Sequence, residues 1–285
     1  MSDIMVSICC TAFNHEKYIA KGIESFLMQQ TRFKVEILIH DDASKDQTAD
    51  IIRHYERLHP EVIKPIYQSE NQYSKGVKVS KFNRERAIGK YIALCEGDDY
   101  WIDPLKLQKQ VDYLEAHPEC TMCVHGAYKV NHDNVKLKRS VRPHRGDKDF
   151  YADEVIKGGG GLFPTNSIVY RQALGHNRPL FMQISPVGDY PLAIYMALQG
   201  YIFYMDEMMS AYRVGASGSW TNHMIHDEKK ATIYYTRMEQ MMDELNDYTN
   251  GSYESSISWV KRQIYLKKNF PQVTRMLKII RNHIG

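Results

Sequence analysis

The sequence has no run of about 18 apolar residues, the length that a membrane-spanning helix needs. Its first ten residues lack the basic start and the long apolar stretch of a secretory signal peptide. The formal net charge of the 285 residues is only +3, so no bulk attraction to nucleic acid is expected. These absences together predict a cytoplasmic protein without a nucleic-acid partner.

Cysteine is scarce, with five residues in the whole chain. Two of them are adjacent in a strand-like apolar stretch, which favours reduced, buried thiols over a disulfide framework. His117, Cys120, Cys123 and His125 have the ligand types of a zinc site. These residues lie on both sides of Pro118 and within a predicted strand. The alternation of side chains along that strand puts Cys123 and His125 on one face and Cys120 on the other, so we interpret the cysteines as core residues.

A glycine-rich phosphate-binding loop is also missing. Neither a G-x-G-x-x-G nor a Walker pattern follows the first predicted strand, which argues against a dinucleotide enzyme or an NTPase. Four consecutive glycines do occur far downstream, at residues 158–161, after a helical pattern. We predict that they form a flexible connection.

Short apolar runs alternate with helical patterns through the first hundred residues. Four of these runs predict strands, at residues 5–10, 35–40, 63–67 and 91–94. The helices between them are expected to begin at caps formed by Asn14 and Ser44, and a third helix is expected through residues 84–88. The third strand should lie near an edge because Pro65 cannot donate to a neighbour. Such alternation predicts βαβ units and a parallel sheet.

Three carboxylates lie directly after the run at 91–94, namely Glu96, Asp98 and Asp99. Asp103 and Pro104 follow, with the residue types of a helix N-cap and first helical position. The acids are therefore predicted in a crevice between a strand's carboxyl end and a helix, where α/β sheets bind ligands. Because they repel one another, a hard divalent cation such as Mg²⁺ or Mn²⁺ is expected among them.

Several blocks of this sequence resemble the family 2 glycosyltransferases with the GT-A fold. The amino-terminal blocks are VSICCTAFN at 6–14 with Glu16, EILIHDDASKDQT at 36–48 and GKYIALCEGDD at 89–99. Segments that resemble the family's acceptor side are TNSIVYR at 165–171, GDYPL at 188–192 and YR at 212–213. The likeness covers roughly residues 4–220.

The resemblance implies an α/β fold with a Rossmann-like, mostly parallel central sheet flanked by helices and a C-terminal helical extension. Residues 1–221 would form the catalytic domain, with a nucleotide-binding half at 1–100 and an acceptor-binding half at 101–221. Residues 222–285 would form the C-terminal helical region.

The resemblance further implies an inverting, divalent-metal-dependent glycosyltransferase, acting as a hexosyl- or N-acetylhexosaminyltransferase. It would move a sugar from a UDP-linked donor to a hydroxyl of a growing surface polysaccharide or lipid-linked glycan. Phe13 offers a flat face for the base and Asp41 an acceptor for its hydrogen bonds, with Thr11 and Glu16 as further nucleoside contacts.

By the same resemblance, Asp98 binds the nucleotide and holds Mn²⁺ or Mg²⁺ together with Glu96. Two departures from the family pattern affect this site. Glu96 replaces the first aspartate of the usual Asp-x-Asp, and Gly215 stands where many relatives have a histidine. His223, His226 or water could replace that histidine, so the third metal ligand stays open.

Asp189 is the implied catalytic base, which takes the proton of the acceptor hydroxyl. It opens a predicted helix at 189–198, and the alternative role is an ordinary helix cap. Its position at a helix amino end predicts a lowered pKa. Trp101, Tyr212 and Trp220 are candidates for stacking on sugars, with core packing as the alternative.

Beyond residue 222 the pattern is helical, which predicts packing on the catalytic domain or on a partner subunit in a homo-oligomer. From Trp259 to Gly285 the chain has seven basic residues and no acidic one, interleaved with apolar residues such as Val260 and Ile264. Such a tail suits peripheral contact with the inner face of the membrane, where lipid-linked acceptors lie. A solvated helix hairpin broken by Pro271 is the alternative.

Two other functions stay open on the sequence. A GT-A-like nucleotidyltransferase is disfavoured because no glycine-rich, arginine-bearing loop follows the first strand. A glycan-binding or assembly subunit without turnover is compatible with Glu96 and Gly215. The sugar, the acceptor and the oligomeric state cannot be read from the residues.

Overall fold

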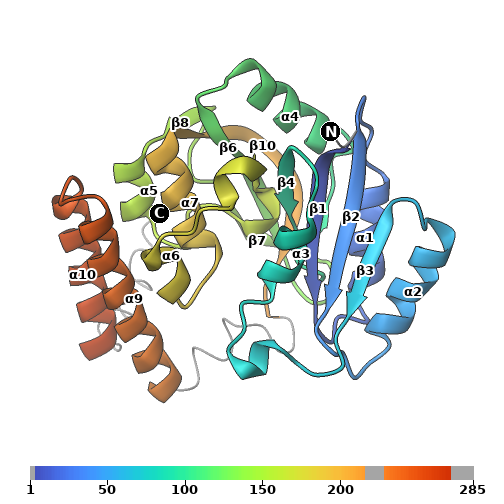
Figure 1. Cartoon of the computed structure of the whole chain (residues 1–285), viewed down its shortest axis with the longest axis horizontal. Coiled ribbons are helices and arrows are strands. Elements are labelled where there is room, and N and C mark those ends of the chain that lie inside the picture. Colours follow the sequence, from blue (N-terminus) through green and yellow to red (C-terminus); the bar gives the residue numbers. More distant parts are fainter. Residues whose placement is uncertain (1–3, 216–227, 271–285) are drawn as a thin grey trace.

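The computed structural model describes residues 4–215 and 228–270 (Figure 1). Trp220, His223, His226 and Pro271 therefore lie outside the described residues. The strands are β1 Ile4–Ala12, β2 Lys34–Asp41, β3 Ile63–Tyr67, β4 Tyr91–Leu94, β5 Tyr100–Trp101, β6 Cys120–Val130, β7 Lys136–Val141, β8 Lys148–Phe150, β9 Val169–Arg171 and β10 Tyr201–Arg213. The helices are α1 Ile19–Leu27, α2 Thr48–Leu58, α3 Ser80–Arg86, α4 Lys106–Ala116, α5 Ala152–Gly158, α6 Leu180–Ile184, α7 Asp189–Gln199, α9 Glu228–Tyr248 and α10 Glu254–Asn269.

All four strands predicted in the first hundred residues are present, as β1 to β4. They pair in parallel in the order β3-β2-β1-β4, and β3 forms the edge, as Pro65 predicts. Apolar side chains fill both faces of β1 and β2, because helices cover the sheet on either side (Figure 1). The carboxyl ends of these strands consequently point toward one edge of the molecule.

The second half of the sheet is mixed. β9 runs antiparallel between β4 and β6, and the long strands β6 and β10 pair in parallel with two irregularities near Met208. Short strands β5, β7 and β8 add antiparallel pairs. The expected α/β architecture with helices flanking a central sheet is confirmed, and all pairing among β1 to β4, within residues 1–100, is parallel.

Three predicted helix starts are wrong by a few residues. Asn14 does not cap α1 but adopts a left-handed conformation with φ 55°, which asparagine tolerates, and α1 begins at Ile19. Ser44 bonds to Asp41 instead of capping α2, and the Asp46 carboxylate accepts from the Thr48 N–H at 3.0 Å. These polar side chains form their hydrogen bonds within the loops rather than with the first turn of a helix, so each helix begins a few residues later than predicted.

The third late start is that of α4, which follows the acidic loop. Asp103 accepts the Leu105 N–H at 2.8 Å, and the helix begins at Lys106. Just before this turn, the residues of the short strand β5 pair with β10 and are therefore extended. The helix therefore starts two residues later than Pro104 predicted.

The C-terminal helices pack on the helices α5 and α6. α9 lies against α6, and α10 lies against α5 and α9 (Figure 1). Val260 and Ile264 are buried in the same core cluster as α7, so they do not face a membrane as the sequence suggested. The described part of the tail is thus a helix hairpin.

In the described ranges no helix is long and apolar enough to cross a bilayer. The division into domains at residue 221 stays a prediction.

The cysteines behave as predicted, because all five are free and buried. Cys123 and His125 lie in β6, where both side chains are fully enclosed. Across the residues with assigned structure, no three His, Cys, Asp or Glu side chains gather into a metal-binding group. The zinc alternative is therefore not supported.

Candidate active site

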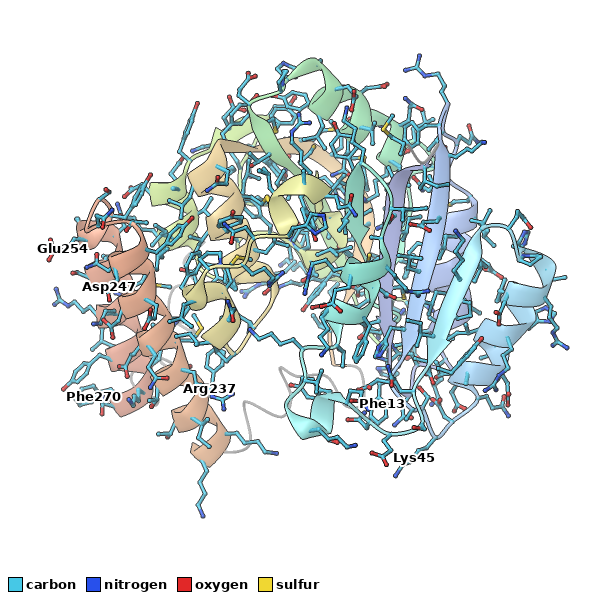
Figure 2. All side chains as sticks on the ribbon, in the orientation of Figure 1. Phe13, Lys45, Arg237, Asp247, Glu254 and Phe270 are labelled. Atoms are coloured by element: carbon cyan, nitrogen blue, oxygen red, sulfur yellow. The ribbon has the colours of Figure 1, made fainter. Side chains whose placement is uncertain are left out.

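The loops that follow β1, β2 and β4 meet where these strands end, and the solvent-facing side of this junction, which carries the exposed Glu96, is called the crevice below. The Gly97 N–H donates to the Thr11 carbonyl at 2.9 Å, and the Asp42 N–H donates to the Ala12 carbonyl at the same distance. These bonds hold the acidic loop and the β2 loop against the end of β1. Phe13 follows directly and is 39% exposed, with Lys45 at the same lower edge of the molecule in Figure 2.

The three loop acids have different surroundings. Asp99 is only 2% exposed and accepts bonds from Asn166 Nδ2 at 3.0 Å and from the Arg213 N–H at 2.7 Å. Glu96 and Asp98, by contrast, accept no hydrogen bond from any described residue, and water reaches both side chains. Only two of the three acids are thus open to a ligand, and Asp99 has a structural role that the sequence did not reveal.

Arg213 holds this loop in place. Its Nε donates to the Asp98 carbonyl at 2.7 Å, and its terminal nitrogens donate to the Asn131 carbonyl at 2.6 Å and to Asn134 Oδ1 at 2.7 Å. The guanidinium also lies 4.1 Å from the ring centre of Tyr18. One buried side chain therefore connects the end of β10, the acidic loop and the β6–β7 turn.

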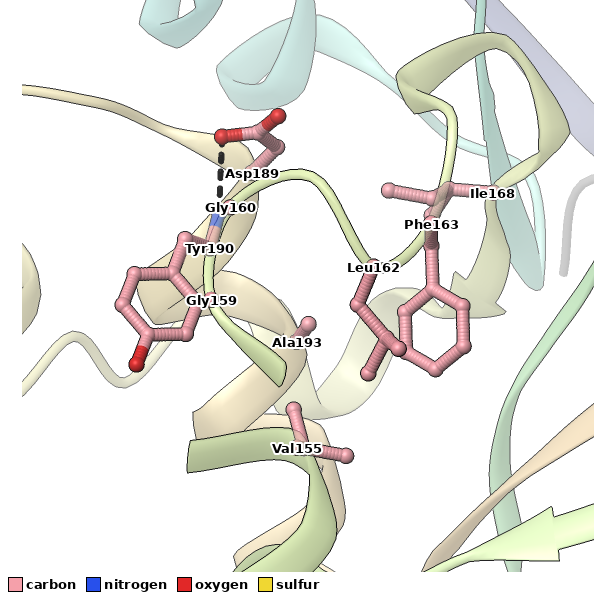
Figure 3. A pocket seen from close by; sticks show the side chains of 9 residues that line it. All are labelled: Val155, Gly159, Gly160, Leu162, Phe163, Ile168, Asp189, Tyr190 and Ala193. Carbon is pink, nitrogen blue, oxygen red and sulfur yellow. Dashed lines mark hydrogen bonds between the residues drawn. The ribbon is translucent and has the colours of Figure 1, made fainter. Parts of the chain in front are cut away.

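Asp189 begins α7, as predicted, and is bonded on both carboxylate oxygens. Oδ1 accepts from the Tyr190 N–H at 2.7 Å (Figure 3), and Oδ2 accepts from Thr165 Oγ1 at 3.1 Å. The predicted lowering of its pKa is wrong, because burial raises the pKa by more than these two bonds lower it. A raised pKa makes this carboxylate a stronger proton acceptor.

The glycine run at 158–161 lies beside this carboxylate rather than in a remote connection. Gly159 and Gly160 line a cavity of about 10 Å³ with Asp189, and a Cβ on Gly160 would come within 3.5 Å of the Tyr190 Cβ (Figure 3). Gly159 has φ 71°, which favours glycine. Because side chains are absent here, the backbone approaches the predicted base closely.

The open carboxylates interact electrostatically across the crevice. The Glu96 side chain has contact with water, but the surrounding protein removes part of its hydration. This desolvation raises the pKa of Glu96, and the charges of Asp98 and Asp189 raise it further. Carboxylate oxygens are the preferred ligands of hard divalent ions. The carboxylates of Glu96 and Asp98 have the chemistry to hold such an ion, and its third ligand stays open because His223 and His226 lie outside the described residues.

The predicted nucleoside contacts are divided among the β1 and β2 loops. Asp41 is 2% exposed, and its carboxylate accepts from the hydroxyl and N–H of Ser44. Glu16 accepts the Gln47 N–H at 3.0 Å, whereas Thr11 and Phe13 are partly open to solvent. A cavity of about 350 Å³ opens beside Asp41, and Phe13 is not among its lining residues.

The three predicted sugar-stacking residues have different positions. Trp101 is 1% exposed, and its Nε1 donates to the Asn166 carbonyl at 2.8 Å, so its predicted sugar contact is contradicted. The ring is instead a core element between Phe26 and Lys106. Tyr212 is half-buried near the carboxylates of the site, whose negative charges add to burial in raising its pKa. Trp220 lies outside the described residues.

His15 is a further residue of the crevice, which the sequence reading overlooked. A Cβ added to Gly97 would lie 2.8 Å from its Nδ1, so the imidazole lies against the acidic loop. This Nδ1 is buried without a hydrogen-bond partner, and burial lowers the pKa of the ring. His15 stands between the block at 6–14 and Glu16, but its residue type alone does not show that it packs against the acidic loop, which comes from a distant segment.

Comparison with known proteins agrees with this geometry. The model of the family described as "Glycosyl transferase family 2" matches residues 7–177. Rv1520 of Mycobacterium tuberculosis, an uncharacterized protein, is 33% identical over 288 residues, covering 98% of this chain and 80% of its own. The Escherichia coli glucosyltransferase WfaP is 36% identical over 113 residues, covering 39% of this chain and 42% of its own.

A solved structure shows the same fold. TarS of Staphylococcus aureus, in its complex with UDP-GlcNAc, superposes with a TM-score of 0.68 at 16% identity, over 93% of this chain and 74% of that chain. The family model covers more than half of the residues. The chain therefore belongs to glycosyl transferase family 2 and has the GT-A fold.

Proposed function

We propose that the protein is an inverting, divalent-metal-dependent enzyme that transfers a sugar from a UDP-sugar to a hydroxyl of a surface-glycan precursor. The observation that carries this proposal is the arrangement of Glu96, Asp98 and Asp189 around one crevice at the carboxyl ends of the parallel strands. Glu96 and Asp98 accept no hydrogen bond from a described residue, whereas Asp189 accepts bonds from two neighbours. This division suits one ion-binding pair and one base.

In this proposal Asp189 accepts the proton of the attacking hydroxyl. The Thr165 hydroxyl and the Tyr190 N–H orient its carboxylate, and burial favours protonation during the reaction. A Mn²⁺ or Mg²⁺ held by Glu96 and Asp98 supplies positive charge that offsets the charge of the leaving diphosphate. The Arg213 bond to the Asp98 backbone keeps that carboxylate in position.

Thr11, Phe13, Glu16 and Asp41 are proposed to bind the nucleoside. Phe13 provides an exposed ring for the base at the end of β1. The Asp41 carboxylate already accepts a hydrogen bond from the Ser44 hydroxyl. In binding the base, this carboxylate would exchange Ser44 for the base as its partner. Tyr212 is proposed to contact the sugar.

A lipid-linked acceptor is the proposed glycosyl acceptor. The name of WfaP states that it acts on GlcNAc-diphosphoundecaprenol, which suggests a diphosphate-linked acceptor here. Helix α10 exposes Trp259, Arg262 and Tyr265 on its surface, and we propose that this face contacts an anionic membrane surface peripherally from the cytoplasm. A homo-oligomer remains a further proposal.

Calorimetric titration of UDP, with and without Mn²⁺, tests the donor and metal assignments. Micromolar binding by the wild type should need Mn²⁺ and should be lost in Asp98→Ala. Asp133→Ala is the control, because it removes an exposed carboxylate from the β6–β7 turn. Equal UDP binding by wild type and Asp98→Ala would contradict the metal site, and UDP binding without any sugar transfer would favour a non-catalytic glycan-binding subunit.

A further inference from the structure

Four cationic side chains gather on the acceptor side of the crevice. Lys78 precedes α3, Arg84 lies within α3, Arg178 precedes α6 and Arg237 lies on α9. Burial lowers the pKa of Lys78 to about 8, and the three guanidinium groups lower it further by their proximity. Arg84 also acts on Arg178 in the same direction. These residues, far apart in sequence, therefore form one positively charged cluster.

Direct contacts between the elements hold this cluster together. The Lys78 Nζ donates to the Met182 carbonyl at 2.9 Å, which ties the segment before α3 to α6. Helix α6 in turn packs on α9, where the rings of Phe181 and Tyr248 lie 5.4 Å apart. Figure 2 shows Arg237 toward the lower edge of the molecule, the edge that also carries Phe13.

The cluster has almost no negative charge of its own. Among the described residues, its only ion pair joins Arg84 to Glu85 at 3.8 Å, at the limit of such contacts. Other basic residues of the C-terminal hairpin are paired, since Lys261 contacts Asp243 and Lys268 contacts Glu239. Gathering like charges costs free energy unless an anion joins them. The composition of this cluster thus indicates an anionic ligand.

The position of the cluster relates it to the predicted base. The α9 side of the cluster lies toward the base, because the charge of Asp189 helps to raise the pKa of Tyr234, which is one helical turn before Arg237 on α9. Guanidinium forks match the oxygens of phosphates, and a diphosphate can engage several cations at once. A carboxylate would offer fewer oxygens to four cations.

We propose that Lys78, Arg84, Arg178 and Arg237 bind a phosphate or diphosphate group of a substrate. The inference rests on the proposed function for the identity of that substrate. Its position beside Asp189 favours the phosphate of a diphosphate-linked acceptor over that of the donor. The C-terminal helices would then supply part of the acceptor site through Arg237.

Titration of inorganic pyrophosphate in the presence of EDTA tests the subsite without metal or turnover. The double variant Arg178→Gln/Arg237→Gln should bind pyrophosphate about tenfold more weakly than the wild type. Arg57→Gln is the matched control, because it removes an exposed arginine from helix α2 and should leave affinity unchanged. No binding by the wild type, or equal binding by the double variant, would overturn the proposal.

Steady-state kinetics then identify the source of the phosphate. For an acceptor phosphate, the double variant should raise the KM for a diphosphate-linked acceptor about tenfold while UDP affinity and the KM for a phosphate-free glycoside stay unchanged. For a donor phosphate, UDP affinity should fall instead. If neither changes, the cluster has no substrate role and the proposal is wrong. A wild type that binds pyrophosphate but not UDP would contradict only the proposed function.

Discussion

Replacing Arg213 by lysine tests the role of this side chain in the acidic loop. Arg213 is 4% exposed and donates to the Asp98 and Asn131 carbonyls and to Asn134 Oδ1. Lysine keeps the charge but cannot reach three acceptors in the fixed geometry of a guanidinium. At least two partly buried oxygens would lose their partner, at about 1–3 kcal/mol each, so Arg213→Lys should lower the free energy of unfolding by about 2 kcal/mol.

Urea unfolding followed by tryptophan fluorescence measures this loss. The control is Arg142→Lys, whose guanidinium pairs with Asp206 while 44% of the Arg142 side chain is exposed, and it should cost less than about 1 kcal/mol. Because the freed Asp98 backbone also positions the proposed metal ligand, Mn²⁺-dependent UDP affinity should fall about tenfold in Arg213→Lys. Equal stability losses in the two variants, or unchanged UDP affinity, would refute this reasoning.

Three further predictions concern separate parts of the molecule. Burial lowers the pKa of Lys106 to about 7 from an ordinary 10.5. Between these pH values the unfolded chain therefore binds more protons than the folded chain, so the stability of the wild type should rise as the pH rises from 7 to 10.5. Lys106→Met should be more stable by about 3 kcal/mol at pH 7, and urea titrations should show the gap closing toward pH 10.5; a constant gap contradicts the charge argument. Asp189→Asn should lower kcat about 10³-fold while calorimetric UDP affinity stays within about twofold, and near-normal turnover would remove Asp189 as base. The double variant Trp259→Ser/Tyr265→Ser should no longer sediment with phosphatidylglycerol vesicles, whereas the control Leu58→Ser, which also removes an exposed apolar side chain, should still do so. Binding of the wild type to neutral vesicles alone would contradict a contribution of charge to this contact.

Much of the fold could be predicted because local patterns decide it. The four early strands follow from apolar runs, and the edge position of β3 follows from Pro65. Helix starts were less predictable, because Asn14 and Ser44 can either cap a helix or bond within a loop. Only the neighbouring loop, which supplies the competing partner, settles that choice.

The candidate site was predicted in part. Glu96 lies close enough to Asp98 and Asp189 for both charges to raise its pKa, although Asp189 is far along the chain, and the roles of these residues stay predictions. The role of Asp99 was not predictable, because its partners Asn166 and Arg213 come from segments far along the chain. Trp101 shows the same limitation, since an aromatic residue after a strand can face either a ligand or the core.

The sequence by itself determined the family, the four early strands and the residues that are proposed to carry the chemistry, because each depends on residue types at short spacings. Tertiary structure alone decided which carboxylates remain open, which direction the pKa of Asp189 shifts and which cations gather around Lys78. Burial and electrostatic proximity depend on contacts between distant segments. A helix amino end predicts a lowered carboxylate pKa, yet desolvation by the surrounding chain outweighs that local effect at Asp189.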